Sequence, residues 1–148
     1  LKNIRNIRAE AGEVLTRIGH PDVVIWDTRR PTEYVGSEVR ADRGGHIPGA
    51  THLNWTELLV EKEGAKVLKE KSEILKLLAE YGITPDKEVI AHCQTGIRSS
   101  YASLVLLGLG YDQVKNYDGS WIEWANNNSL PIVVSDEVLQ KKQVASTE

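Results

Sequence analysis

The sequence predicts a three-layer α/β domain in which a central, mostly parallel sheet of about five strands carries helices on both faces. Two short, continuous apolar runs, at 23–26 and 89–91, are typical of strands that are buried on both faces. Segments with helical patterning lie between such runs, and strands that alternate with helices form parallel sheets. Sites in these sheets lie at the carboxyl ends of the strands. The polar residues that follow the two runs are therefore the first candidates for a site.

The amino-terminal part of the chain is predicted to form a helix and then a strand. The helix spans 8–18, and its apolar residues share one face, namely Ala11, Val14, Leu15 and Ile18. Gly19 and Pro21 end it. The strand over 23–26 follows and ends in the polar triplet Asp27-Thr28-Arg29.

The middle of the chain is rich in turn signals. It is predicted as a loop over 30–45 with one helical turn at 32–35, a turn over 45–50, a short strand over 51–54, a short helix at 58–59 and a charged break over 61–65. The pattern from 69 to 81 is helical, with an apolar stripe made by Ile74, Leu75, Leu77 and Leu78. Gly82 ends this helix.

The last part of the domain starts with the strand over 89–91. The helix over 101–109 that follows is too apolar to lie at the surface. A strand over 114–117 precedes a helix over 121–126, for which Ser120 and Glu123 predict a capping box. An edge strand over 130–134 is expected last. We therefore place one domain at 1–134 and a polar carboxyl-terminal tail at 135–148.

Composition excludes several classes of protein. The chain has 148 residues and a net charge of −3, which argues against nucleic acid as a partner. It lacks an apolar run of about 18 residues, so no membrane span is expected. A single cysteine rules out an internal disulfide, and we expect a reducing, cytoplasmic location. The chain begins at Leu1 and contains no methionine, which suggests a trimmed protein or one half of a longer one.

The single cysteine, Cys93, lies directly after the strand at 89–91 and before a tight turn that contains Gly96. In such a strand–turn–helix unit, backbone N–H groups of the turn point at the sulfur, and the helix dipole adds positive potential. Both effects favour the thiolate, which is the nucleophilic form of cysteine. The alternative is a small buried apolar residue. The residues that follow Cys93 favour the nucleophile.

The spacing between Cys93 and Arg98 separates two chemistries. A loop with five intervening residues forms a bowl wide enough for a phosphate, whereas four residues, Gln94 to Ile97, intervene here. The narrower ring of N–H donors suits one extra sulfur atom on the cysteine. Donors that converge on a persulfide anion stabilise it as an oxyanion hole stabilises a developing charge. The spacing therefore favours sulfur transfer over phosphoryl transfer.

Four groups of residues follow one another along the chain. They are Asp27-Thr28-Arg29 with Glu33-Tyr34, Gly45-His46-Ile47-Pro48-Gly49-Ala50, Cys93-Gln94-Thr95-Gly96-Ile97-Arg98, and Tyr117-Asp118-Gly119-Ser120-Trp121. With these motifs in this order, the chain resembles a rhodanese domain, of the sulfurtransferase family, from about residue 8 to 134. It is most similar to the carboxyl-terminal, catalytic half of two-domain thiosulfate sulfurtransferases. The resemblance implies that Cys93 accepts the sulfur and that the backbone of Gln94, Thr95, Gly96, Ile97 and Arg98 cradles the persulfide.

The function that this resemblance implies is sulfur transfer by double displacement. Cys93 takes the outer sulfur of a small anionic donor such as thiosulfate, and a thiol, cyanide or a protein acceptor then removes it. No metal or organic cofactor is expected, because the histidines show no ligand spacing. Two alternatives stay open. One is a sulfur-relay or non-catalytic binding domain of a larger protein, and the other is a Cys-dependent phosphatase or arsenate reductase, which the spacing disfavours.

The chain departs from the two-domain thiosulfate enzymes at two places. Gln94 and Thr95 are neutral where those enzymes carry basic residues. Glu33, six residues after Asp27, occupies the slot of their substrate-binding arginine. Arg98 and Arg43 are therefore the cations expected to hold an anionic donor.

Other polar and aromatic residues near the motifs are weaker candidates. Asp27 and Arg29 are expected to fasten loops beneath the site rather than to react. His46 is expected to be a hydrogen-bonding strut, and His92 to point to the opposite face of its strand from Cys93. Trp121 either lines the mouth of the pocket or fills the core.

Overall fold

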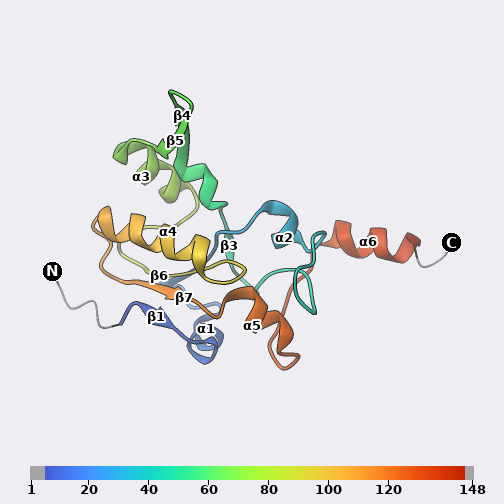
Figure 1. Cartoon of the computed structure of the whole chain (residues 1–148). Helices are drawn as coiled ribbons and strands as arrows, with labels where there is room; N and C mark the ends of the chain where they lie inside the picture. Colours follow the sequence, from blue (N-terminus) through green and yellow to red (C-terminus); the bar gives the residue numbers. More distant parts are fainter. Residues whose placement is uncertain (1–5, 146–148) are drawn as a thin grey trace.

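The computed structural model describes residues 6–145, except for the side chain of Lys142. Its main sheet has five strands in the order β1-β7-β6-β2-β3, and all neighbouring pairs are parallel. The strands are β1 (Arg8–Ala9), β2 (Val23–Asp27), β3 (Thr51–His52), β6 (Glu88–His92) and β7 (Val114–Tyr117). The helices are α1 (Ala11–Arg17), α2 (Pro31–Val35), the 3-10 helix η1 (Trp55–Leu58), α3 (Lys71–Glu80), α4 (Ile97–Gly108), α5 (Ser120–Asn126) and α6 (Asp136–Ala145) (Figure 1).

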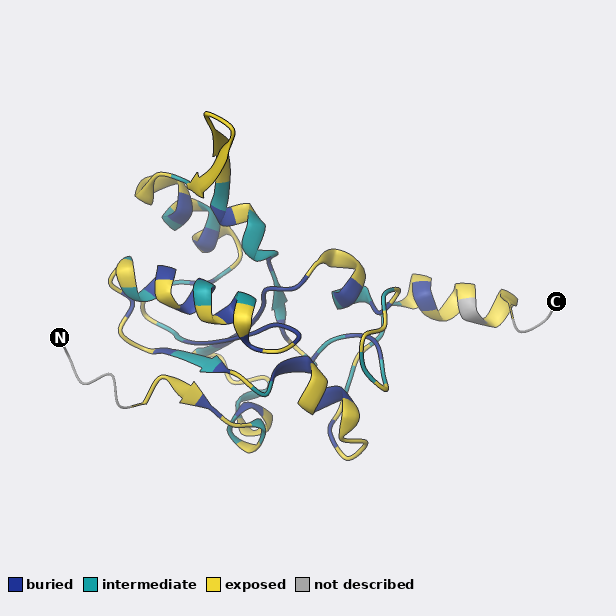
Figure 2. Cartoon of the chain, in the orientation of Figure 1, coloured by how far each residue is buried: buried dark blue, intermediate teal, exposed yellow. Residues whose placement is uncertain are grey.

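A hydrophobic core lies on each face of the sheet. Successive side chains of a strand point to opposite faces, so Val24 and Trp26 enter one core and Ile25 enters the other. The first core lies under α3 and α4, and the second lies under α1 and α5. Figure 2 shows buried residues alternating with exposed ones along α3, α4 and α5. The predicted three-layer α/β fold is therefore confirmed.

The register of β2 and β6 brings their polar ends together. Val23 pairs with Glu88, and Asp27, at the end of β2, pairs with His92, at the end of β6. The residues that follow the two strands, Thr28 and Cys93, therefore leave the sheet side by side at its carboxyl edge. The expectation that the triplet after β2 and the cysteine after β6 meet at one edge is confirmed.

The amino-terminal segment differs from the prediction of a helix over 8–18. Arg8 and Ala9 form β1, which pairs with Asn116 and Tyr117 of β7, and the helix begins only at Ala11. A strand of two residues carries no detectable periodicity, and the pairing that creates it is with a segment about a hundred residues away. Leu15, expected on the core face, is 41% exposed.

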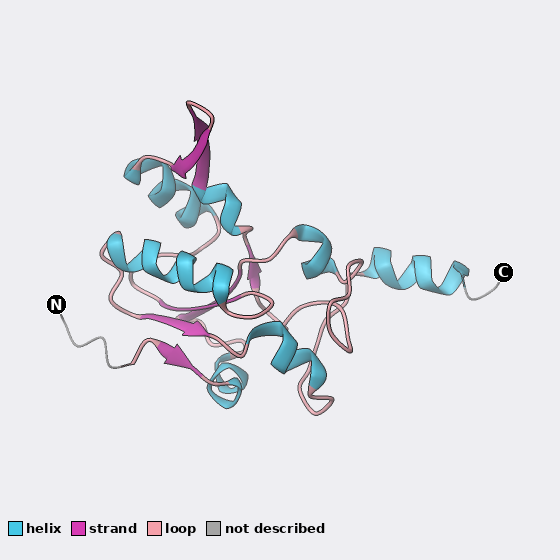
Figure 3. Ribbon diagram, in the orientation of Figure 1, coloured by secondary structure: helices cyan, strands magenta, loops and turns pink. Residues whose placement is uncertain are grey.

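A hairpin replaces the predicted charged break over 61–65. Strands β4 (Leu59–Lys62) and β5 (Ala65–Leu68) pair antiparallel and project from the body beside α3 (Figure 3). Glu63 and Gly64 form the turn, both with positive φ, at 52° and 78°. The hairpin was missed because its side chains are largely exposed, so its composition is that of a loop. The short helix predicted at 58–59 is η1 and ends at Leu58, where β4 begins at Leu59.

The carboxyl-terminal segment also differs. The edge strand predicted over 130–134 is reduced to one antiparallel bridge between His46 and Val133. Within the segment predicted to be a polar tail, Asp136–Ala145 form α6. Ser135 joins this helix to α2 through its N–H, which donates to the Val35 carbonyl at 3.2 Å. Within residues 6–145, none of the helices has the length and apolar character that a membrane span requires.

Candidate active site

Cys93 is the free thiol at the end of β6. Its side chain is 1% exposed. Helix α4 begins at Ile97, four residues earlier than the sequence predicts, so the connecting loop consists of residues 93–96 only. Gly96 closes the loop with φ 89°, a left-handed conformation that favours glycine. This conformation turns the chain directly into α4 and folds the loop around the sulfur.

Hydrogen-bond donors surround the Cys93 sulfur. The Gly96 N–H donates to Sγ at 3.1 Å, and the Ser99 hydroxyl lies 3.6 Å from the same atom. Burial alone raises the pKa of the Cys93 thiol, but the donors of Ser99, Thr95 and Gly96 outweigh it and lower this pKa below its ordinary value. The loop is therefore built to hold an anion on sulfur.

Arg98, in the first turn of α4, is bound by a buried carboxylate. Its two terminal nitrogens donate to both oxygens of Glu33, at 2.8 and 2.9 Å. Glu33 lies in α2, is 1% exposed, and also accepts from Arg30 and Arg40 at 3.2 Å each. Burial opposes ionisation, but the bonds from Arg98 and Arg30 hold the pKa of Glu33 at about 2. The Glu33 carboxylate, and to a lesser extent the Cys93 sulfur, raise the pKa of Arg98.

The Asp27-Thr28-Arg29 triplet at the end of β2 contains a buried ion pair. Arg29 donates to both oxygens of Asp27, the shortest contact being 2.7 Å, and to the Gly45 carbonyl at 2.7 Å. Its guanidinium lies 4.4 Å from the centre of the Trp121 ring. Asp27 and Arg29 are 0% and 1% exposed, so they tie the ends of several elements together and do not reach solvent.

The side chains of His46 and His92 contact backbone carbonyl groups rather than the Cys93 sulfur. His46 Nδ1 lies 2.9 Å from the Tyr34 carbonyl, and its ring stacks on that of Tyr34 with centroids 3.8 Å apart. His92 is fully buried, 3.7 Å from Asp27, and burial lowers its pKa. Both positions agree with structural roles.

The remaining cradle residues differ in exposure. Gln94 is buried, and its amide donates to the Arg40 carbonyl at 2.7 Å. Thr95 and Ile97 are exposed, and Ile97 reaches 75%. The side chains at 94, 95 and 97 are thus neutral, and Arg98 is the charged residue of this motif.

Arg43 lies apart from the anion-binding role expected of it. Its guanidinium donates to the carbonyls of Ala125, Asn127 and Leu130, at 2.9, 2.6 and 3.0 Å. These bonds occupy the group and fasten the end of α5, so Arg43 is not assigned to the donor site. Trp121 is 1% exposed and belongs to the second core, which excludes it from an open pocket mouth.

Sequence reasoning missed two serines that contact the loop. Ser99 lies one turn into α4 and reaches the sulfur. Ser120 was expected to cap α5 with Glu123, but no such box forms: φ of Ser120 is 54°, its hydroxyl accepts from the Cys93 N–H at 3.2 Å, and Glu123 accepts from the Tyr117 hydroxyl. The position of Ser99 directly after Arg98 was the only feature of the sequence that could have indicated its contact with the sulfur. Nothing in the local pattern indicated the left-handed turn at Ser120.

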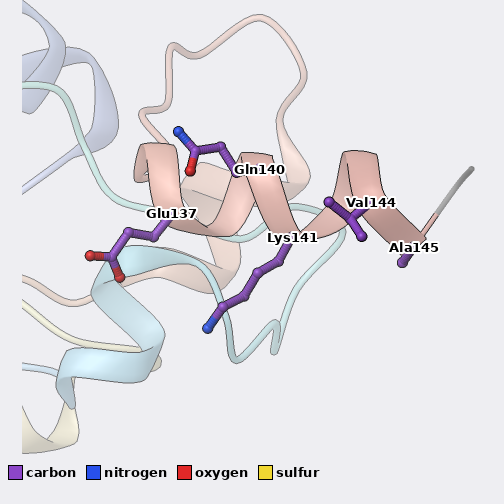
Figure 4. A pocket seen from close by; sticks show the side chains of 5 residues that line it. All are labelled: Glu137, Gln140, Lys141, Val144 and Ala145. Carbon is purple, nitrogen blue, oxygen red and sulfur yellow. The ribbon is translucent and has the colours of Figure 1, made fainter.

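A further hollow, shown in Figure 4, runs along α6 and is lined by Glu137, Gln140, Lys141, Val144 and Ala145. It is remote from Cys93 in sequence and contains no nucleophile. Within the described part of the chain, His, Cys, Asp and Glu side chains form no group of three that could hold a metal ion.

A thiol of lowered pKa, held in a strand–loop–helix unit at the carboxyl edge of a parallel sheet, defines a class of α/β domains suited to covalent chemistry on sulfur. Residues 10–127 match the family of the rhodanese-like domain. The chain therefore belongs to the rhodanese-like domain family.

Relatives and solved structures agree with this assignment. The chain is 45% identical over 119 residues to the thiosulfate sulfurtransferase of Pseudomonas aeruginosa, a match that covers 80% of this chain and 43% of that protein. It is 36% identical over 145 residues to the sulfur carrier protein TtuD of Thermus thermophilus, covering 92% of this chain and 50% of the relative. The chain thus spans about half the length of the curated relatives it matches.

Among solved structures, the anaerobic ergothioneine biosynthesis enzyme from Chlorobium limicola, in complex with its natural substrate trimethyl histidine, is similar with a TM-score of 0.78 and 26% sequence identity. The match covers 87% of this chain and 32% of that one. A complex of EanB with ergothioneine gives a TM-score of 0.79 at 26% identity and the same coverage.

Proposed function

We propose that this protein is a sulfurtransferase that moves sulfane sulfur from a small anionic donor, such as thiosulfate, to a thiol or cyanide through a persulfide on Cys93. The observation that carries the proposal is the ring of donors around the sulfur, with the Gly96 N–H 3.1 Å from Sγ. These donors favour the attacking thiolate, and the same backbone of Gln94, Thr95, Gly96, Ile97 and Arg98 is suited to an outer sulfur that carries the charge after transfer.

The reaction consists of two displacements. The Cys93 thiolate attacks the outer sulfur of thiosulfate, the new S–S bond forms, and sulfite leaves with the electron pair of the broken S–S bond. An acceptor such as cyanide then attacks the outer sulfur of the persulfide and leaves as thiocyanate, which restores the thiolate. Two easy displacements replace one difficult transfer, and no redox partner is consumed.

Arg98 is the cation that we assign to the anionic donor. Its guanidinium lies at the start of α4, is partly exposed, and is near enough to Cys93 for the sulfur to raise its pKa. The two bonds to Glu33 fix its orientation. A doubly charged donor that approaches the loop meets this fixed positive charge before it meets the sulfur.

A sulfur-relay role is the second candidate. The 36% identity to a protein named a sulfur carrier supports it. In a relay the same persulfide forms, but a protein acceptor removes the sulfur and cyanide does so slowly. A reduced Cys93 is needed in both cases, which supports a reducing compartment such as the cytoplasm. A phosphatase or arsenate reductase is disfavoured by the narrow loop, and no metal or cofactor is required by either displacement.

The two candidates are separated by steady-state kinetics with thiosulfate and cyanide. A sulfurtransferase of this kind gives parallel double-reciprocal lines, because the donor product leaves before the acceptor binds. Persulfide formation without turnover by cyanide or small thiols selects the relay. If the protein hydrolyses an aryl phosphate and forms no thiocyanate from thiosulfate and cyanide, the proposal is contradicted.

A further inference from the structure

The loop after Cys93 is held from outside by β7 and by the first residues of α5. The Trp121 N–H donates to the Cys93 carbonyl at 3.0 Å, and the Ile122 N–H donates to the Gln94 carbonyl at 3.1 Å. A third bond, from Asn116 Nδ2, reaches the Gly96 carbonyl at 3.3 Å. Figure 1 shows the beginning of α5 next to the loop that precedes α4. The Cys93 and Gln94 carbonyls are therefore directed at the start of α5, whereas the Gly96 carbonyl contacts β7 and also accepts from the Ser100 N–H at 3.0 Å.

These bonds decide where the N–H groups of the loop point. A trans peptide is planar, with its N–H opposite its C=O, so a carbonyl held outward turns the N–H of the same peptide inward. The Gln94 carbonyl and the Thr95 N–H share one peptide. The Ile122 bond on that carbonyl therefore aims the Thr95 N–H at the sulfur, where it contributes to the lowered pKa of Cys93.

Ser120 makes this arrangement possible in two ways. Its φ of 54° is a left-handed conformation, unfavourable for a residue with a Cβ, and it starts α5 so that the next two N–H groups meet the loop. Its hydroxyl accepts from the Cys93 N–H at 3.2 Å and donates to the Tyr117 carbonyl at 2.8 Å. Ser120 is fully buried, so its hydroxyl makes these two bonds away from solvent.

We propose that Ser120 is a positioning residue for Cys93. Its hydroxyl fixes the Cys93 backbone, and its left-handed turn holds the α5 N–H groups against the loop carbonyls, which keeps the inner N–H groups aimed at the sulfur. Helix capping does not explain Ser120, because α5 has no side-chain cap bond. The use of this arrangement in sulfur transfer rests on the proposed function. The effect of Ser120 on the reactivity of the Cys93 thiol does not depend on that function.

The test is the rate of alkylation of the Cys93 thiol by iodoacetamide, followed by mass across a range of pH. Two variants remove the hydroxyl: Ser120→Ala keeps the unfavourable φ, and Ser120→Gly relieves it, so at least one is expected to fold. The matched control is Ser103→Ala, another buried serine of the chain, whose hydroxyl donates to the Ser99 carbonyl within α4. Melting temperatures are recorded for all variants.

In both Ser120 variants, Cys93 is expected to be alkylated about two- to tenfold more slowly than in the parent at neutral pH. This factor is the free energy of one lost hydrogen bond converted to a ratio of rates. The midpoint of their pH profiles moves upward, and the control keeps the parent profile. A folded Ser120 variant with the parent profile overturns the proposal, as does an equal change in Ser103→Ala. Alkylation of Cys93 needs no sulfur donor. If the parent protein takes up no sulfur from thiosulfate, the proposed function is refuted, but the alkylation test of Ser120 remains valid.

Discussion

Glu33 is a buried carboxylate that meets three guanidinium groups, from Arg30, Arg40 and Arg98. From the sequence, Glu33 occupies the slot of the substrate-binding arginine of two-domain thiosulfate enzymes. In the structure its carboxylate instead holds three guanidinium groups together. An arginine at this position would be buried among three others of like charge. We therefore expect Glu33→Arg to lower the activity with thiosulfate rather than to raise it.

The ionisation of Glu33 makes a pH-dependent contribution to stability. Its folded-state pKa of about 2 lies below its ordinary value of 4.5, so its contribution is present above pH 4.5 and is lost as pH falls toward 2. Glu33→Gln is expected to be less stable at neutral pH by roughly 2 to 3 kcal/mol, and this difference should shrink across that acidic window. Urea unfolding at a series of pH values measures it. A constant difference down to the lowest pH, or a loss equal to that of the exposed control Glu57→Gln, contradicts this account.

Arg98 is expected to act on the donor and on the thiol together. Arg98→Ala should lower the second-order rate with thiosulfate by roughly one to three decades, because one charge-assisted contact is lost and the thiol becomes less acidic. Arg98→Lys keeps the charge but cannot bind both oxygens of Glu33, so an intermediate rate is expected. The exposed Arg8→Ala serves as the control in the same steady-state assay. Parent-like rates in Arg98→Ala would assign the donor site to another residue.

At the scale of elements, the site depends on the close approach of the loop before α4 to the connection between β7 and α5. A Cβ on Gly96 would lie 2.8 Å from the Asp118 carbonyl oxygen and 2.9 Å from its Cα, and φ there is 89°. Gly96→Ala should therefore lower the free energy of unfolding by about 1 to 3 kcal/mol and slow alkylation of Cys93. Chemical denaturation and the alkylation rate test it. Gly108→Ala, at the end of α4, has open space around its Cβ and is the control. An unchanged alkylation rate in Gly96→Ala would refute the close-approach argument.

In the β4–β5 hairpin, a substitution is expected to stabilise the protein rather than to destabilise it. Its turn places Glu63 at φ 52°, a conformation that asparagine and glycine adopt at lower cost. Glu63→Asn should raise the free energy of unfolding by about 0.5 to 1 kcal/mol and leave sulfur transfer unchanged, because the hairpin contributes no residue to the loop around Cys93. Differential scanning calorimetry gives the shift in Tm. A destabilised Glu63→Asn variant would show that the turn holds Glu63 for another reason.

Elements were predictable from the sequence where a local pattern and the tertiary role agree. The unit from β6 to α4 was found because an apolar run, Cys93, Gly96 and a second apolar run follow one another directly. β1 was not found, because two residues become a strand only through pairing with β7. The hairpin and α6 have loop-like compositions, and their structure comes from backbone pairing and helix propensity that the apolar pattern does not report.

For the whole molecule, the sequence located the candidate nucleophile, Cys93, but not the network of contacts around it. Parallel strands that end at one edge were sufficient to bring Asp27 and Cys93 together. The pairing of Glu33 with Arg98 joins segments 65 residues apart, and the bonds from α5 to the loop join residues 27 or 28 positions apart. Such contacts depend on how the layers pack and cannot be predicted from one sequence. For this reason Arg43 was expected at the donor site, and Ser120 was expected to cap α5.

The whole account depends on Cys93 taking up one sulfur atom. Intact mass spectrometry after mixing with thiosulfate, in the parent and in Cys93→Ser, measures this directly. The parent should gain about 32 Da, the mass of one sulfur, and lose it again when cyanide is added. Cys93→Ser should keep its mass, because a hydroxyl is far less acidic than the thiol. A folded parent that gains no sulfur, or a serine variant that gains the same mass, contradicts the account.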